Sequence, residues 1–103
     1  MLLKQYQTQA KQFAMYSNDM YPIASLMVES AELADLFIKP KLRGDIKPID
    51  RKEVISEAGD VLWNLANLLS DQGIDLDEVA KYNIEKLASR MARGVVKGDG
   101  GDR

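Results

Sequence analysis

The amino-acid sequence predicts an all-α domain, a helical bundle of about four helices. Three observations support this fold class: apolar residues recur at three- and four-residue steps, helix-start signals precede two of the apolar segments, and Pro or Gly residues separate the segments. No β-hairpin signal interrupts this pattern. With 103 residues, 46% of them hydrophobic and 29% charged, residues 1–103 are expected to form a single globular domain.

The first helix is expected at the N-terminal end. Leu3, Tyr6, Ala10 and Phe13 form an apolar stripe at helical spacing, with polar residues between them, and the helix is expected to stop near residues 18–19. This segment has no long apolar run, so it predicts neither a signal peptide nor a membrane span. We therefore expect a cytoplasmic protein.

The second helix is expected from about Pro22 to Ile38, because Pro22 suits a first helical turn and Pro40 is expected to end the helix. Residues 39–50 contain Gly44 and Pro48 and are interpreted as a loop. This loop is the most basic stretch of the chain. A solvated basic loop is the simpler interpretation, and attraction of a phosphate chain is the alternative.

Two helix-start signals place the third and fourth helices. Residues 50–53 read Asp-Arg-Lys-Glu, which resembles a capping box, and the third helix is expected to run to about Asp71. Residues 75–78 repeat this signal, and the fourth helix is expected to run to about Arg93. The Gly-rich tail, 94–103, is expected to have no regular structure. Because these helices are too apolar for one small core, self-association is expected.

The composition excludes several classes of chemistry. The chain has no cysteine and no histidine, so it lacks thiolate zinc sites, disulfides and the usual Ser-His or Cys-His nucleophile pairs. Its net charge is −2, with 14 basic and 16 acidic residues, which disfavours a general nucleic-acid binder. Catalysis would therefore depend on carboxylates, Lys, Tyr, hydroxyls or a hard metal ion.

Two pairs of carboxylates stand out. Glu29 and Glu32 lie three residues apart on the second helix, and Glu57 and Asp60 lie three apart on the third. Residues at this spacing share one helix face, so two antiparallel helices can direct all four carboxylates at one cation. Oxygen-only ligation suits Mg²⁺, Mn²⁺ or Ca²⁺.

Taken alone, such pairs usually mark a solvated surface, but three features argue otherwise here. None of the four carboxylates has a Lys or Arg four residues away, and both pairs lie among apolar residues. The third feature is Gly59, which lies inside the predicted helix between Glu57 and Asp60, where Gly costs about 0.8–1 kcal/mol relative to Ala. Close approach of a ligand or helix and ordinary tight packing are both consistent with this glycine.

These residues resemble the MazG-like nucleoside triphosphate pyrophosphohydrolases, a family of all-α NTP pyrophosphatases. Glu29-x-x-Glu32 followed by Glu57-x-x-Asp60 is similar to the family's paired motif, the stretch 57–90 looks like its third and fourth helices, and the ending 93–103 is similar to a Gly-Asp-x-Arg tail. The resemblance covers about residues 22–103. One departure is Val28, where many members have an acidic residue.

The resemblance implies hydrolysis of NTPs or dNTPs to a monophosphate and pyrophosphate with Mg²⁺, for which Mn²⁺ could substitute, by a homodimer or homotetramer. The net charge and the lack of a long apolar run predict no nucleic-acid or membrane partner, and a role in nucleotide-pool house-cleaning would suit the implied activity. Glu29, Glu32, Glu57 and Asp60 would be the metal ligands, with Glu32 and Glu57 in catalytic roles and Glu32 positioning the water. The expected substrate-binding residues are Asn64, Asn83, Lys86, Arg90, Arg93 and Arg103.

Each of these assignments has an alternative. The basic stripe on the fourth helix is also typical of the C-terminal end of a surface helix. Arg103 could instead belong to a frayed chain end, and Trp63 to the core or to an interface. At the level of function, the alternatives are a non-catalytic helical interaction or regulatory dimer and a metal-storage or metal-sensing bundle.

Overall fold

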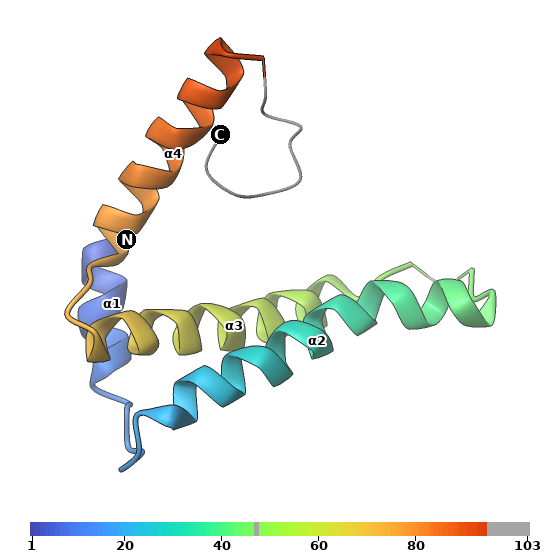
Figure 1. The fold of residues 1–103 in the computed structure, drawn as a ribbon. Helices are drawn as coiled ribbons and strands as arrows, with labels where there is room; N and C mark the ends of the chain where they lie inside the picture. The colour runs from blue at the N-terminus through green and yellow to red at the C-terminus, as the bar shows by residue number, and fades with distance from the viewer. Residues whose placement is uncertain (47, 95–103) are drawn as a thin grey trace.

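The structure is a computed structural model that describes residues 1–46 and 48–94. The described residues contain four α-helices and no strand, which confirms the all-α prediction (Figure 1). Lys47 and the tail 95–103, including Arg103, lie outside the described residues. The helices are α1 (Leu3–Lys11), α2 (Met20–Arg43), α3 (Arg51–Asp71) and α4 (Leu76–Ala92).

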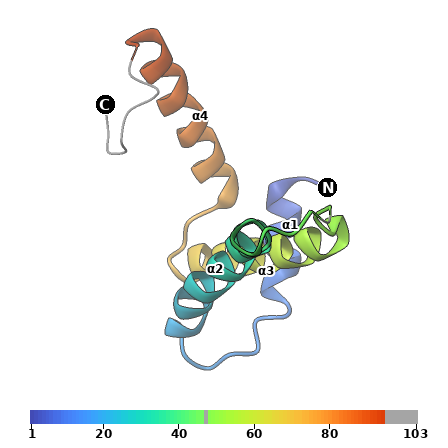
Figure 2. The same ribbon diagram turned by 90° about the vertical axis from the view of Figure 1, so that its right-hand side faces the viewer.

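An antiparallel pair of long helices, α2 and α3, forms the frame of the molecule (Figures 1 and 2). The start of α3 is where the sequence predicts it, because the Asp50 side chain accepts hydrogen bonds from the backbone N–H groups of Lys52 and Glu53, at 3.0 and 3.4 Å. These bonds satisfy two amides that have no partner within the helix. The predicted end at Asp71 is also confirmed.

The prediction that Pro40 ends the second helix is wrong, because α2 continues for another turn, to Arg43. This last turn is closed by bonds that do not need a proline N–H: Gly44 N–H donates to the Lys41 carbonyl and Asp45 N–H to the Pro40 carbonyl. Gly44 has φ +74°, a left-handed conformation that suits a residue without Cβ. Gly44 therefore terminates α2.

The first helix is shorter than the apolar stripe predicts, since α1 ends at Lys11. The backbone N–H groups of Phe13 and Ala14 bond to carbonyls three residues back, so the chain tightens into a turn there. The ring of Tyr16 beyond this turn stacks on Tyr21, with ring centroids 5.6 Å apart. The aromatic residues after Lys11 therefore pack between elements and do not extend the helix.

A buried glutamine fastens α1 to the turn between α3 and α4. The Gln7 side-chain amide donates to the Ile74 carbonyl at 2.9 Å and to Ser70 Oγ at 3.2 Å, and its oxygen accepts from the Leu76 N–H at 2.8 Å. The buried hydrophobic cluster lies beside it and consists of Ala10, Ala66 and Leu76. The described core is therefore small and lies at the junction of α1, α3 and α4.

Helix α4 projects away from the α2–α3 pair and packs substantially only on α1 (Figures 1 and 2). The expected four-helix bundle is therefore not closed within one chain. The radius of gyration is 16.5 Å, whereas a compact chain of this length has one of about 13 Å. Many large apolar side chains, such as Met27, Ile55 and Ile84, remain exposed. How many copies assemble stays a prediction.

None of the helices in the described ranges is long and apolar enough to cross a membrane.

Candidate metal and nucleotide site

Three of the four predicted carboxylates converge at the middle of the α2–α3 pair. Glu29 of α2 and Glu57 and Asp60 of α3 each offer a carboxylate oxygen, and these oxygens lie within 4.8 Å of one another. We refer to these three residues as the carboxylate cluster. The spacing of Glu57 and Asp60 on α3 brings both side chains to the face that meets Glu29.

The carboxylate cluster has no basic partner among the described residues. One oxygen of Glu29 and one of Glu57 are buried without a hydrogen-bond partner. The ion pairs formed between described side chains, Lys39 with Asp35 and Arg43 with Asp45, lie elsewhere. Buried carboxylate oxygens without a donor are costly, and a cation removes that cost.

The acidity of Glu29 reflects this crowding. The pKa of Glu29 is raised to about 7, and desolvation is the largest cause. Glu32 raises it further through a hydrogen bond and through charge repulsion. Repulsion from Asp60 and a hydrogen bond to Glu57 act in the same direction. A carboxyl group surrounded by three others retains its proton unless a positive charge replaces it. The hard-oxygen donors, their short separations and their missing partners fit a divalent cation such as Mg²⁺ or Mn²⁺.

Glu32 lies outside the group of converging oxygens but contacts Glu29. It lines a groove of about 450 Å³ that extends from Glu57 toward the end of α2. This acidic groove has six acidic side chains and two basic ones, Lys39 and Arg43, each paired with an aspartate. Lys39 and Arg43 belong to the helix and not to a loop, which corrects the interpretation of residues 39–50.

Asn64 shares the α3 face of the carboxylate cluster and is buried, with 3% of its surface exposed. Its amide nitrogen donates to the Asp60 carbonyl at 2.8 Å, and its side-chain oxygen is buried without a partner. The predicted place of Asn64 on the carboxylate stripe therefore fits the structure, while its contact with a sugar or base stays a prediction.

An aromatic pocket of about 520 Å³ lies at the α1–α2 connection, and sequence reasoning did not find it. Tyr16, Tyr21 and Trp63 line it, and Tyr16 O–H donates to the Asp71 carboxylate at 2.8 Å. Trp63 meets Tyr16 edge-on and is one turn beyond Asp60 on α3. In the sequence, Tyr16 and Tyr21 precede the predicted second helix, but that pattern alone does not show that the two rings stack. Their stacking depends on the turn that follows α1.

Tyr6 of α1 is a second residue that the sequence did not single out for the site. Its pKa is raised, first by burial and then by the negative charge of Asp60. Tyr6 is half-buried against the core, so α1 brings a phenol near the edge of the carboxylate cluster.

The predicted phosphate-binding residues of the fourth helix are not brought to the carboxylate cluster by their own chain. Helix α4 has no substantial packing on α2 or α3 within the described ranges. The Lys86 ammonium lies 5.9 Å from the centre of the Tyr82 ring, and Arg93 donates to the Ser89 carbonyl. Asn83, Lys86, Arg90 and Arg93 are all on α4, and Arg103 lies outside the described residues.

Close approach does not explain Gly59 within the chain. A Cβ placed on Gly59 would meet no atom within 4 Å. Neither tight helix packing nor a neighbouring element of the same chain therefore requires a glycine here.

The chain is similar to known proteins. Residues 22–94 match the sequence profile of the family described as MazG nucleotide pyrophosphohydrolase domain. The chain is similar to the protein named Gene 37 protein of Mycobacterium phage L5, with 36% identity over 86 residues, which are 81% of this chain and 75% of the phage protein. No solved structure shows significant similarity to the chain. The matched residues span α2, α3 and α4 and leave α1 outside.

Proposed function

The chain belongs to the MazG nucleotide pyrophosphohydrolase domain family, and on that premise we propose that it hydrolyses nucleoside or deoxynucleoside triphosphates to the monophosphate and pyrophosphate with a divalent cation. The observation that carries this proposal is the convergence of Glu29, Glu57 and Asp60 without a basic partner. A role in removing unwanted nucleotides from the cell's pool is consistent with this activity.

The carboxylate cluster would hold Mg²⁺ or Mn²⁺ through Glu29, Glu57 and Asp60, with Glu32 beside them. When bound, such an ion polarises phosphate oxygens and makes a coordinated water more acidic. The carboxylate of Glu32 is exposed and contacts Glu29, and in this proposal it accepts a proton from the water that attacks the α-phosphorus. Pyrophosphate would then leave.

The aromatic pocket supports a nucleotide as the substrate. Tyr21 is 53% exposed, and Tyr16 and Trp63 line the same pocket, so a planar base can stack there. Trp63 follows Asp60 by one helical turn, about 5 Å along α3, so α3 contributes one residue to the pocket and one to the carboxylate cluster. The phosphate chain would then lie toward the carboxylates and the base toward the α1–α2 connection.

The test is a panel of NTPs and dNTPs with Mg²⁺, in which the released product is identified. We expect pyrophosphate from at least one nucleotide and no orthophosphate. The Glu57→Gln variant should lose activity at least 100-fold, as expected for loss of a group that holds the charge of the transition state. Glu78→Gln is the matched control, because Glu78 is exposed in the first turn of α4, outside the carboxylate cluster and the acidic groove, and should retain activity.

Absence of turnover with every nucleotide would contradict the proposal and would favour the non-catalytic interaction dimer. Release of orthophosphate would also contradict it, because hydrolysis would then occur at the γ-phosphorus.

A further inference from the structure

We propose that Lys39, with Arg43 one turn behind it on α2, binds the β- and γ-phosphates of the substrate and holds the pyrophosphate that leaves. The orientation of the nucleotide is taken from the proposed function, so this inference rests on it and deepens it. The sequence left open that residues 39–50 attract a phosphate chain, and in the structure two cations of this stretch line the acidic groove.

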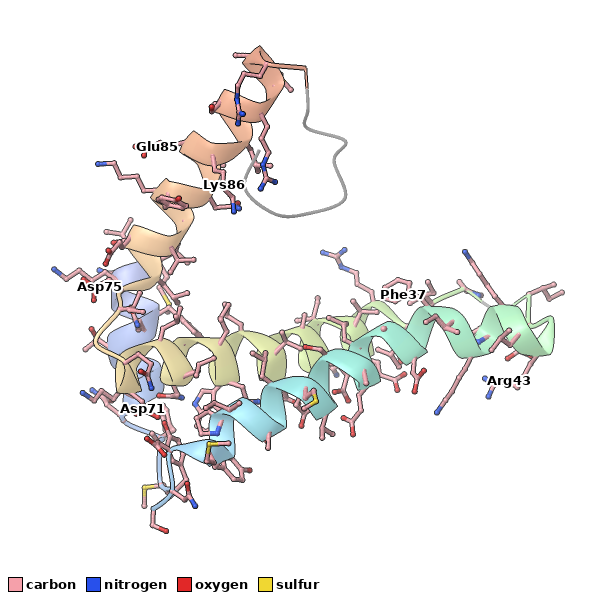
Figure 3. The ribbon with its side chains drawn as sticks, in the orientation of Figure 1. Phe37, Arg43, Asp71, Asp75, Glu85 and Lys86 are labelled. Carbon is pink, nitrogen blue, oxygen red and sulfur yellow. The ribbon has the colours of Figure 1, made fainter. Side chains whose placement is uncertain are left out.

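The acidic groove connects the carboxylate cluster with these two cations. Glu32 and Glu57 line the groove at the cluster, and Lys39 and Arg43 line it toward the end of α2. Among the described residues that line the groove, these two are the basic ones. Figure 3 shows Arg43 near the end of α2 and Lys86 on the projecting helix α4, apart from the α2–α3 pair. A phosphate chain that extends from the cluster along the groove therefore meets the cations of α2.

Tyr21, Glu32 and Lys39 follow one line along α2. At 3.6 residues per turn, Tyr21 and Lys39 are about five turns apart, and Glu32 deviates from their line by about 20°. Glu29 of the carboxylate cluster lies between Tyr21 and Lys39 in the sequence. The order along α2 is therefore an aromatic ring, the carboxylates and a cation. The base, the α-phosphate and the terminal phosphates of a nucleoside triphosphate follow one another in the same order.

The Lys39 side chain points back toward the carboxylates. Its ammonium lies 3.4 Å from the carboxylate of Asp35, one turn earlier on α2. Side chains of an α-helix lean toward its N-terminus, which favours this direction. Asp35 follows Glu32 by three residues, or about 4.5 Å along the helix. The positive charge therefore lies about one turn from Glu32, where a phosphate chain that starts at the cluster can reach it.

Both ion pairs of the groove can exchange a carboxylate for a phosphate. The side chains of Lys39 and Asp35 are 62% and 45% exposed, and those of Arg43 and Asp45 are 63% and 39% exposed. Ion pairs this exposed contribute little, because water and salt screen them. A phosphate group accepts several charge-assisted hydrogen bonds, and Arg can donate two of them at once. The two aspartates can then turn to water.

The other acidic side chains of the groove have compensation of their own. Asp50 accepts hydrogen bonds from the N–H groups of Lys52 and Glu53. Glu53 lies in the first turn of α3, where the helix dipole favours negative charge. Glu32 and Glu57 lie at the end of the groove that would hold the metal ion. The groove can therefore accept a phosphate chain despite its six acidic side chains.

Positive charge at this place assists the bond cleavage of the proposed reaction. The water oxygen forms a bond to the α-phosphorus, and the water proton passes to a carboxylate of the site. The bond from the α-phosphorus to the oxygen that bridges it to the β-phosphorus breaks, and its electron pair stays on pyrophosphate. Groups that bind charge as it develops lower the barrier. Lys39 should therefore affect kcat as well as binding.

The first test is calorimetric titration of the protein with inorganic pyrophosphate in Mg²⁺, without any nucleotide. Lys39→Ala should weaken pyrophosphate binding by about tenfold or more, as for loss of a hydrogen bond to a charged group. Arg43→Ala should weaken it less, because Arg43 lies one turn farther from the cluster. Lys41→Ala is the matched control and should bind like the wild type, since Lys41 is exposed on the same stretch of α2 and does not line the groove.

Three calorimetric results would overturn the proposal. The first is a wild-type chain that does not bind pyrophosphate. The second is equal affinity of Lys39→Ala and Lys41→Ala, because the loss would then reflect net charge alone or be absent. The third is a larger loss from Arg43→Ala than from Lys39→Ala. The Lys39→Ala chain should keep the helical circular dichroism spectrum of the wild type, as expected for an exposed residue.

Product inhibition then separates the terminal phosphates from the rest of the nucleotide. Lys39→Ala should raise the inhibition constant of pyrophosphate by about tenfold or more and leave that of the nucleoside monophosphate unchanged, since the monophosphate has no β- or γ-phosphate. The value of kcat should fall by a similar factor, and Lys39→Arg should restore most of it. Equal increases in both inhibition constants would show that Lys39 acts on the whole site through structure, and would overturn the proposal.

The outcomes distinguish this inference from the proposed function. If Lys39→Ala releases pyrophosphate with the kcat and the product inhibition of the wild type, the role of Lys39 is refuted and the proposed function stands. If pyrophosphate binding depends on Lys39 in a chain that hydrolyses no nucleotide, the proposed function is contradicted and the pyrophosphate site in the groove is supported.

Discussion

At the scale of single residues, Glu29 concentrates the chemistry of the site. Its carboxyl is crowded by three acidic neighbours, and its pKa of about 7 results first from burial and then from these neighbours. A carboxyl with a raised pKa holds its proton to a higher pH than usual, and a bound cation would favour its ionised form. Proton and metal therefore compete for the same oxygens.

The first prediction concerns the stability of the metal-free chain. The folded-state pKa of Glu29 is raised from 4.5 to about 7, so protonated Glu29 stabilises the folded state. This contribution to the free energy of unfolding is fully present below pH 4.5 and is lost as the pH rises through 7. In EDTA, the free energy of unfolding should therefore fall more between pH 5 and pH 7.5 for the wild type than for Glu29→Gln. Urea denaturation at both pH values measures this. Parallel curves for the two proteins would exclude Glu29 as the titrating group.

The second prediction concerns metal affinity. Glu57→Gln removes one charged ligand from the carboxylate cluster and should weaken Mn²⁺ binding at pH 7.5 by about tenfold or more. Calorimetric titration of the protein with Mn²⁺ measures the change without any nucleotide. Glu53→Gln, outside the cluster, should bind Mn²⁺ like the wild type. If both variants bind equally well, the ion does not bind at this cluster.

At the scale of elements, the sequence predicted α3 most accurately. Asp50 and Asp71 bound this helix as expected, because a side-chain cap is a local interaction. The end of α2 was predicted wrongly at Pro40, because a proline one turn before a helix end removes only one backbone hydrogen bond. Gly44 terminates the helix instead. The arrangement of α4 could not be read from its own sequence, since it depends on which surfaces it meets.

The candidate site also contains both residues that the sequence predicted and residues that it did not. Glu29, Glu57 and Asp60 were predictable because helical periodicity fixes which side chains share a face. Tyr6 and Tyr16 were not, since their positions depend on how α1 crosses α3 and on the turn after Lys11. Contacts between elements far apart in the sequence leave no periodic signal.

The third prediction concerns the attachment of α1. Gln7→Ala removes the acceptor of the Leu76 N–H and the donor to the Ile74 carbonyl, which leaves buried polar groups unpaired. The free energy of unfolding should fall by about 1–3 kcal/mol, as for other buried groups that lose their partner. Gln9→Ala, at an exposed position of the same helix, should change it by less than about 0.5 kcal/mol. Urea denaturation compares the two, and equal losses would show that the Gln7 contacts contribute little.

At the scale of the whole molecule, the chain has a small core and a large exposed apolar surface. In the part that the structure describes, the buried hydrophobic cluster consists of Ala10, Ala66 and Leu76. So small a core is a weak source of stability for an extended helical chain. If copies of the chain associate through exposed apolar side chains such as Met27 and Ile55, stability will depend on the concentration of the chain.

The last prediction follows from mass action. If folding and dimerisation are linked, a hundredfold rise in chain concentration stabilises the folded assembly by about 2.7 kcal/mol, which raises the melting temperature by several degrees. Leu62→Glu places a charge among the exposed apolar side chains of α3, where Leu62 is 36% exposed, and should remove any dimer and this concentration dependence. Differential scanning calorimetry from micromolar to high micromolar concentrations measures both proteins. A wild-type melting temperature independent of concentration would mean that one chain is stable alone, because only a concentration-dependent transition links folding to association.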